Sequence, residues 1–171
     1  MISKMVGLHK VSKNAITPER VTEKSACYDL FVCLSAGNLI TFFDEYNNKY
    51  TDVVLKGNNI ALRPKCRYIL PSGCKFLIPE GYSIRVHPRS GLAIKSGIYL
   101  SNCEGIIDED YPEQTRILIT NSTMVDFEVT HGDRLAQIEL SPSIEMLFED
   151  IDDFGQITDR VSGLGSTGVK A

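Results

Sequence analysis

The sequence predicts an all-β fold, and three observations support this prediction. Short apolar stretches recur along the chain, and Gly, Pro and Asn separate them at short intervals. No window longer than about ten residues holds a helical apolar period well. This spacing is typical of a β-sandwich or β-barrel. With 171 residues, the chain is long enough for one domain with a substantial core.

The expected strands follow one another along most of the chain. They are YDLFVCL (28–34), YTDVVL (50–55), RYILPS (67–72), KFLIPE (75–80), SIRVH (83–87), RILIT (116–120), DFEVT (126–130) and RLAQIEL (134–140). Between the fifth and sixth of these lies SGLAIKSGI (90–98), the best helical candidate. Gly91 and Gly97 restrict it to a turn or two. We therefore expect at most one short helix.

Two segments depart from this pattern. Residues 36–60 are rich in Asn and hold two aromatic pairs, which indicates a long hairpin or an insertion. Residues 156–171 contain almost nothing to bury, which predicts a flexible tail that orders only on a partner or ligand. The expected organisation is a β domain over 1–155, with the insertion at about 36–60, followed by a C-terminal arm.

Composition narrows the classes of function. The formal net charge of −4 and the pI near 5.4 argue against binding to nucleic acid backbones. An anionic ligand would need a few locally placed cations and a metal ion. The chain has no apolar run long enough to cross a bilayer and no signal-peptide pattern, so we expect a cytoplasmic protein without a membrane partner. The five cysteines lack C-x-x-C spacing, which argues against structural zinc and favours reduced thiols, mostly in the core.

Five short segments in chain order carry the chemistry: ACYDL (26–30), PRSGLA (88–93), NCEGIIDEDY (102–111), GDRLAQ (132–137) and RVSGLGSTG (160–168). In PRSGLA, a cation, a hydroxyl and a glycine in succession make a compact anion-binding turn. The alternative is an ordinary helix start with Ser90 as its cap. The two interpretations are compatible, because a helix start can itself bind phosphate.

The acidic triplet in GIIDEDY raises the question of which carboxylate is functional. If Ile106 and Ile107 enter the edge of the core, Asp108 is the first carboxylate beyond the apolar wall. A carboxylate there can accept a proton from a water molecule held against a phosphorus atom. Glu109 and Asp110 are interpreted as parts of a solvated turn.

Together, the five segments resemble the ordered motifs of the trimeric dUTPase family, nucleotide hydrolases built on a β jelly roll. The resemblance covers about residues 25–168. It implies hydrolysis of dUTP to dUMP and pyrophosphate by attack of water on the α-phosphorus, with Mg²⁺ and with Asp108 as the general base. It also implies a homotrimer with active sites at subunit interfaces. The insertion and the shortened tail motif suit a viral or phage protein.

The resemblance also implies the residues that contact the substrate and the metal. Asp29 would act near the magnesium through coordinated waters. Asp133 and Arg134 are interpreted as a structural pair that braces their loop. The Tyr111 ring would pack under the sugar and exclude a 2′-hydroxyl, and the Asn102 amide would pair with uracil. The implied phosphate contacts are Arg89, Ser90, Gly91, Gln137, Arg160, Gly165, Ser166 and Thr167.

Three other functions remain as alternatives. A dCTP deaminase would need a glutamate in the strand after the aspartate hairpin, where this chain has Leu118, so deamination is disfavoured. A nucleotide sensor or regulator could use the same scaffold and contact a protein partner through 36–60. A purely structural jelly-roll subunit would have no reason to hold all five segments in order.

Overall fold

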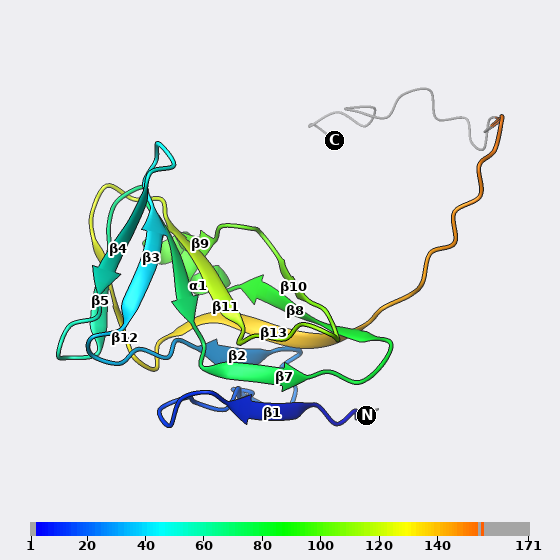
Figure 1. Cartoon of the computed structure of the whole chain (residues 1–171), viewed down its shortest axis with the longest axis horizontal. Coiled ribbons are helices and arrows are strands. Elements are labelled where there is room, and N and C mark those ends of the chain that lie inside the picture. Colours follow the sequence, from blue (N-terminus) through cyan, green and yellow to red (C-terminus); the bar gives the residue numbers. More distant parts are fainter. Residues whose placement is uncertain (1–2, 154, 156–171) are drawn as a thin grey trace.

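A computed structural model describes residues 3–153 and 155. Within this part of the chain the fold is almost entirely β, with a single short helix. Two larger sheets lie against each other, and two short two-stranded sheets extend them (Figure 1). The all-β prediction with at most one short helix is therefore confirmed.

The sheet that carries most of the chemically interesting residues has four strands in the order β10-β8-β13-β2. Every pairing in it is antiparallel. Because its members are distant in sequence, this sheet brings several of the sequence motifs side by side. Its strands are β2 (Tyr28–Phe31), β8 (Tyr82–Pro88), β10 (Gly105–Ile107) and β13 (Arg134–Pro142).

The second large sheet has five antiparallel strands in the order β4-β3-β6-β11-β9. The rest of the strands form two antiparallel pairs, β1 with β7 and β12 with β5. The bounds in the five-stranded sheet are β3 (Leu39–Phe43), β4 (Lys49–Val53), β6 (Arg67–Pro71), β9 (Ile98–Leu100) and β11 (Arg116–Asn121). The bounds in the two pairs are β1 (Gly7–Lys10), β7 (Cys74–Leu77), β5 (Asn59–Leu62) and β12 (Phe127–Thr130).

The inward faces of both large sheets form one hydrophobic core. Leu30, Val86 and Ile138 come from the four-stranded sheet, and Leu70 and Ile117 come from the five-stranded sheet. Alternate residues along each strand point to opposite faces, so the neighbours of these apolar side chains face away from the core. This alternation leaves the outer face of the four-stranded sheet free to carry polar groups.

Residues 36–60 form a hairpin rather than an appendage. Strands β3 and β4 pair with each other, and β3 also pairs with β6 of the main sheet. Phe42 stacks on Tyr68, with ring centroids 4.8 Å apart, and is fully buried. The segment therefore supplies part of the core.

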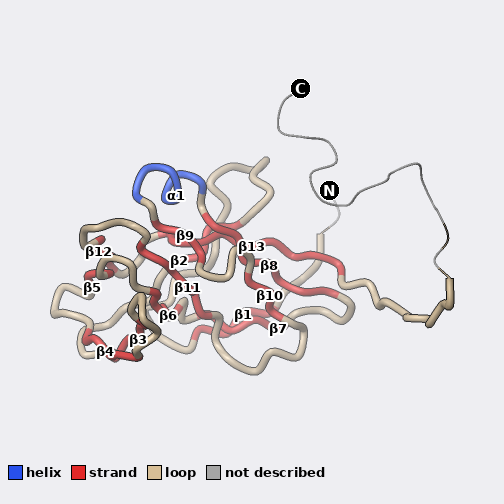
Figure 2. The backbone as a smooth tube through the Cα atoms, turned by 90° about the horizontal axis from the view of Figure 1, so that it is seen from above, coloured by secondary structure: helices blue, strands red, loops and turns tan. Residues whose placement is uncertain are grey.

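The helix α1 (Ser90–Ser96) lies outside the sheets and buries none of its residues (Figure 2). It ends at Gly97, which has φ of 64°, a left-handed conformation that glycine adopts without strain. The helix therefore has the predicted length of a turn or two, with its end at Gly97, whereas Gly91 lies within its first turn.

After β13, the described chain leaves the body of the molecule (Figure 1). Its apolar side chains lie in solvent, with Leu147 87% and Phe148 89% exposed. In the described part of the chain, no helix is long and apolar enough to span a membrane.

Candidate active site

A buried carboxylate organises one end of the four-stranded sheet. Asp29 in β2 is 7% exposed, and each of its oxygens pairs with a guanidinium group. Arg89 Nε lies 3.2 Å from Oδ1, and Arg134 Nη1 lies 3.2 Å from Oδ2. Arg89 Nη1 also donates a hydrogen bond of 2.7 Å to the Arg134 carbonyl. The Asp29 charge is therefore compensated, and both arginines are held in place.

The strand register adds Gln137 to this group. Gln137 in β13 aligns with Asp29 on one side and with His87 on the other. Its Nε2 donates a hydrogen bond of 3.0 Å to the Pro88 carbonyl, just before Arg89. Three of the five motifs, ACYDL, PRSGLA and GDRLAQ, thus meet on adjacent strands.

Asp133 and Arg134 both make structural contacts, as expected from GDRLAQ, but within the described residues they pair with other groups and not with each other. Asp133 Oδ2 accepts a hydrogen bond of 2.8 Å from the Thr130 amide and closes the turn between β12 and β13. Arg134 instead reaches across to Asp29. Asp133 lies in the turn before β13, whereas Arg134 is the first residue of that strand, so the two side chains have different partners.

At the start of α1, the structure differs from an ordinary capped helix. Arg89 occupies the N-cap position, and no side chain forms a capping hydrogen bond there. Ser90, the expected cap, is the first helical residue and is exposed. A Cβ atom added at Gly91 would meet nothing within 4 Å. A ligand can therefore approach this backbone closely.

Asp108 is the first residue after β10. Ile107 before it is buried, and Asp108 itself is exposed. The expectation that Ile106 also enters the core is wrong, because Ile106 is 56% exposed on the outer face. The Tyr111 amide donates to the Asp108 carbonyl at 3.1 Å and closes the turn. Within the described residues, the Asp108 carboxylate has no protein hydrogen-bond partner, so it is free to accept a proton from a ligand or water.

The neighbouring Glu109 has a structural role. Its Oε2 accepts a hydrogen bond of 2.7 Å from the Gly81 amide and ties the acidic turn to the loop between β7 and β8. This contact is invisible in the sequence, since the two residues are far apart in the chain. It distinguishes Glu109, which braces the turn, from Asp108, which does not.

The two other expected hairpin residues lie at either side of β10. Asn102 is exposed in the preceding turn, where its carbonyl accepts a hydrogen bond of 2.6 Å from the Glu104 amide. A Cβ at Gly105 would lie 3.4 Å from Asn102 Nδ2 and 3.2 Å from Val86 Cβ, so the glycine permits close packing. Tyr111 follows the acidic turn and is 36% exposed. Both side chains are accessible to a ligand.

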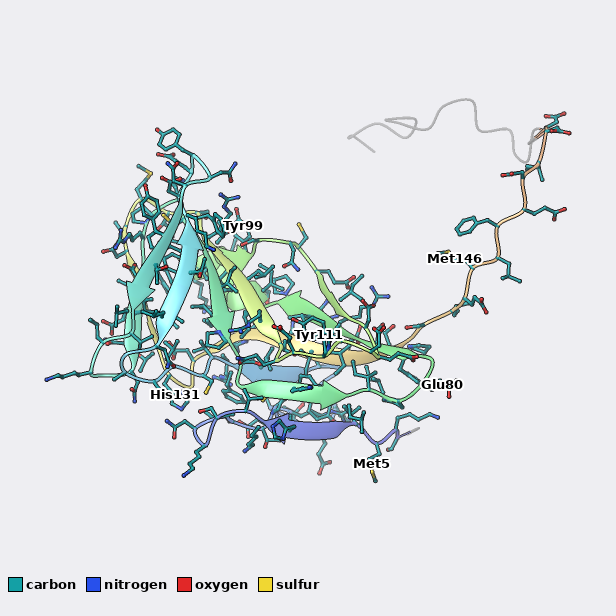
Figure 3. The ribbon with its side chains drawn as sticks, in the orientation of Figure 1. Met5, Glu80, Tyr99, Tyr111, His131 and Met146 are labelled. Atoms are coloured by element: carbon teal, nitrogen blue, oxygen red, sulfur yellow. The ribbon has the colours of Figure 1, made fainter. Side chains whose placement is uncertain are left out.

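Asp108 and Arg89 do not meet within one chain. Ile107 pairs with Ile84 in β8, and Arg89 follows β8 five residues further on. Asp108 lies one residue further from Arg89 than Ile107 does, so six residues separate the two levels. This corresponds to about 20 Å along the strand, at roughly 3.3 Å per residue, which is more than the two side chains span together. Figure 3 shows Tyr111 among the side chains of the described chain. One chain thus presents the carboxylate and the basic loop as separate parts of a site.

The expected tail residues Arg160, Gly165, Ser166 and Thr167 lie outside the described residues. Their assignment remains a prediction.

Sequence reasoning missed a second polar group on the same face of the sheet. Donor atoms of Cys27, His87 and Glu139 all lie within 4.8 Å of one another. Burial and the nearby charges of Glu139 and Asp29 raise the pKa of the Cys27 thiol. Each residue is two positions from a motif residue, namely Asp29, Arg89 and Gln137. Strand alternation places each of them on the same face as its motif residue, but only the strand pairing shows that the three meet.

Comparison with known proteins assigns the family. A family model for dUTPase matches residues 51–168, a range that includes Arg89, Asp108 and Gln137. Among curated proteins, the deoxyuridine 5′-triphosphate nucleotidohydrolase of Roseobacter denitrificans is 42% identical over 110 residues, which are 64% of this chain and 72% of that protein. The enzyme of the same name from Finegoldia magna is 38% identical over 111 residues, 65% of this chain and 78% of that protein.

Solved structures agree at the level of the fold. The dUTPase of Staphylococcus bacteriophage 80alpha with dUPNHPP has a TM-score of 0.75 and 21% identity, covering 98% of this chain and 100% of that one. A mutant dUTPase from phage phi11 of S. aureus, in which a structural Mg(II) ion is coordinated, has a TM-score of 0.67 and 20% identity, covering 88% and 99%. The jelly-roll expectation thus agrees with these folds. Since the family match spans both the Arg89 loop and the Asp108 hairpin, the chain belongs to the dUTPase family.

Proposed function

We infer that this protein is a dUTP diphosphatase that hydrolyses dUTP to dUMP and pyrophosphate. The observation that carries this conclusion is the family match over residues 51–168, supported by curated relatives named for this activity. The geometry is consistent with it, because the described residues present a carboxylate without a protein partner at Asp108 and a rigidly held cation at Arg89.

Asp108 acts as the general base. Its exposed carboxylate takes a proton from a water molecule as the water oxygen bonds to the α-phosphorus. The bond from that phosphorus to the bridging oxygen breaks, and pyrophosphate leaves with the bonding electrons. Glu109 is held by the Gly81 amide and stabilises the turn from which Asp108 projects.

Arg89, Ser90 and Gly91 bind the phosphate chain. The ion pair with Asp29 fixes the Arg89 guanidinium, so that little side-chain entropy is lost when a phosphate binds. The open space beside Gly91 lets phosphate oxygens approach the backbone N–H groups. Gln137 lies next to this loop and contributes a further polar contact.

The residues fit a magnesium ion that arrives with the nucleotide. Both oxygens of Asp29 are engaged by arginines, so direct ligation by Asp29 is unsuited, whereas its remaining lone pairs can accept hydrogen bonds from metal-bound water. Mg²⁺ keeps several waters and binds substrate phosphates, which matches such an indirect contact. When bound, the ion would neutralise charge on the phosphates and favour departure of pyrophosphate.

The two exposed hairpin residues select the nucleoside. The Asn102 amide offers both a donor and an acceptor for the uracil edge. The Tyr111 ring packs against the sugar and leaves no room for a 2′-hydroxyl. Closure over the triphosphate, which orients the reacting groups and excludes bulk solvent, is assigned to Arg160, Gly165, Ser166 and Thr167.

The active form is a homotrimer whose sites combine parts of different subunits. The separation of Asp108 from Arg89 in one chain supports this proposal, since a single protomer cannot bring both to one phosphate chain. The exposed apolar segment after β13 gives each protomer a surface that another copy can cover.

The decisive experiment replaces Asp108, the proposed general base. Asp108→Asn should bind dUTP with Mg²⁺ but lose about 10²–10⁴-fold or more in turnover number, because the amide cannot accept the proton. Pyrophosphate release under single-turnover conditions measures the loss. Asp110→Asn is the matched control, since Asp110 is exposed in the same turn and should keep full activity. An unchanged turnover number in Asp108→Asn would refute the assignment.

A further inference from the structure

The outer face of the four-stranded sheet carries a cluster of metal-type donors that the proposed hydrolysis does not use. Cys27 directly precedes β2, His87 lies in β8, and Glu139 lies in β13. One ligand atom from each lies within 4.8 Å of the other two. The three residues come from adjacent strands, so the sheet itself fixes their relative positions.

The distances already approach those of a metal site. His87 Nε2 lies 3.2 Å from Glu139 Oε1. Tetrahedral zinc, with bonds of about 2.0–2.3 Å, separates its ligand atoms by about 3.3–3.8 Å. The imidazole and the carboxylate therefore need almost no movement, and the Cys27 sulfur needs only a modest side-chain rotation to join them.

The other nitrogen of His87 has the partner that metal-binding histidines require. Glu104 Oε1 lies 3.5 Å from His87 Nδ1, and Arg85 Nη1 donates to Glu104 Oε2 at 3.3 Å. His87 therefore has a carboxylate at each ring nitrogen, Glu139 at Nε2 and Glu104 at Nδ1. A metal ion bound at Nε2 would replace the proton there, and Glu104 would hold the proton on Nδ1. The arrangement thus includes an orienting contact as well as the three donors.

We propose that Cys27, His87 and Glu139 bind a zinc-type transition-metal ion, with Glu104 as a positioning residue for His87. A thiolate, an imidazole and a carboxylate suit Zn²⁺ and not the oxygen-preferring Mg²⁺. Three protein ligands leave the fourth position to water. The ion would join β2, β8 and β13 next to the Asp29 ion pairs.

The cysteine spacing of the sequence argued against structural zinc, since there is no C-x-x-C pair. That pattern detects ligands that are close in sequence, whereas these three meet only through strand pairing. Because cysteine binds a metal ion as the thiolate, metal binding at this site would release a proton.

Cobalt spectroscopy on the full-length protein tests the site, because Co²⁺ bound to a thiolate gives a sulfur-to-cobalt charge-transfer band in the near ultraviolet. Titration with Co²⁺ in excess Mg²⁺ should produce this band at one ion per chain, and Zn²⁺ should displace it. Zn²⁺ at about 100 times its Kd should raise Tm by about 5–10 °C.

Substitutions of single residues show which side chains bind the metal ion. Cys27→Ser should abolish the band, and His87→Gln should abolish tight zinc binding, whereas the exposed Cys103→Ser and His9→Gln should leave both unchanged. Glu104→Gln should keep the band but weaken affinity about 10–100-fold, as expected of a group that acts through a ligand.

Far-UV circular dichroism of the metal-free variants shows whether each is folded. If Cys27→Ser does not fold, Glu139→Gln serves as the second variant that tests metal binding at the cluster. A band that persists in Cys27→Ser, or zinc affinity equal in His87→Gln and the unmodified protein, would overturn the proposal. The cluster would then be a histidine–carboxylate pair beside a neutral thiol.

Discussion

Asp29 lies between two guanidinium groups and serves both stability and the substrate loop. A buried charge that loses its partner is costly, but Arg134 is 45% exposed and Arg89 is 28% exposed, so water compensates part of the loss. Asp29→Asn should therefore lower the free energy of unfolding by about 1–3 kcal/mol, below the range for fully buried pairs. Urea unfolding measures this change.

The same substitution should raise KM for dUTP, because Arg89 loses the negative charge of the ion pair that holds it for the phosphates. Asp126→Asn provides the control, as Asp126 is exposed. If Asp29→Asn has the same free energy of unfolding as the unmodified protein, the two ion pairs make no net contribution to stability.

At the scale of single residues, sequence motifs identified the groups whose roles depend on their immediate neighbours in the chain. Asp108 follows an apolar pair, and Arg89 precedes a glycine-containing turn, so both could be singled out. Glu109 and Cys27 could not, since their partners, Gly81 and the His87–Glu139 pair, are brought to them only by the fold.

At the scale of elements, the two glycines at the start and end of α1 differ in whether the fold requires glycine. Gly97 has φ of 64°, and a Cβ there would lie 2.7 Å from Thr123 Cγ2. Gly91 has normal helical geometry and open space around its Cα. The fold therefore requires glycine at position 97 but not at position 91.

Alanine substitutions at Gly97 and Gly91 should change the stability of the protein in opposite directions. Gly97→Ala should destabilise the protein by about 2 kcal/mol or more, from left-handed strain and the Thr123 clash. Gly91→Ala should stabilise it by about 0.5–1 kcal/mol, since alanine is the better helix former. Thermal unfolding should show Tm moving in opposite directions. A shift in the same direction for both would contradict this account.

The hairpin at 36–60 shows why elements are easier to predict than their partners. Alternating apolar residues and Asn-rich turns indicated strands, but pairing of β3 with β6 depends on residues distant in sequence. Since Phe42 and Val54 are buried in the core, deletion of 36–60 would disrupt the fold as well as any binding surface. A partner that contacts this hairpin is better sought with substitutions at the exposed Tyr46.

At the scale of the whole molecule, the proposed site shared between subunits predicts complementation between two inactive chains. Asp108→Asn chains keep the C-terminal arm but lack the base. Chains truncated after Asp159 keep the base but lack the arm. Each alone should be inactive. Trimers formed from both should recover activity, because a truncated subunit supplies Asp108 while a full-length neighbour supplies the arm.

With random assembly from equal amounts, about a quarter of the sites combine an intact hairpin with an intact arm from another subunit. Co-expression with two affinity tags isolates the mixed species for measurement of pyrophosphate release. Mixed trimers without activity would show that each chain builds its site alone. The overall class of fold was accessible from the sequence, whereas the separation of Asp108 from Arg89, which supports the proposed shared site, depends on the register of β10 on β8.

Cys103 projects from the turn beside Asn102, has φ of 60°, and is exposed, whereas Cys33, Cys66 and Cys74 are buried. This difference gives the protein a natural attachment point for a fluorescent label within one residue of the proposed uracil contact. A dye placed there would sense the arrival of the nucleotide base directly, so that ligand exchange could be followed in real time without altering the reacting groups.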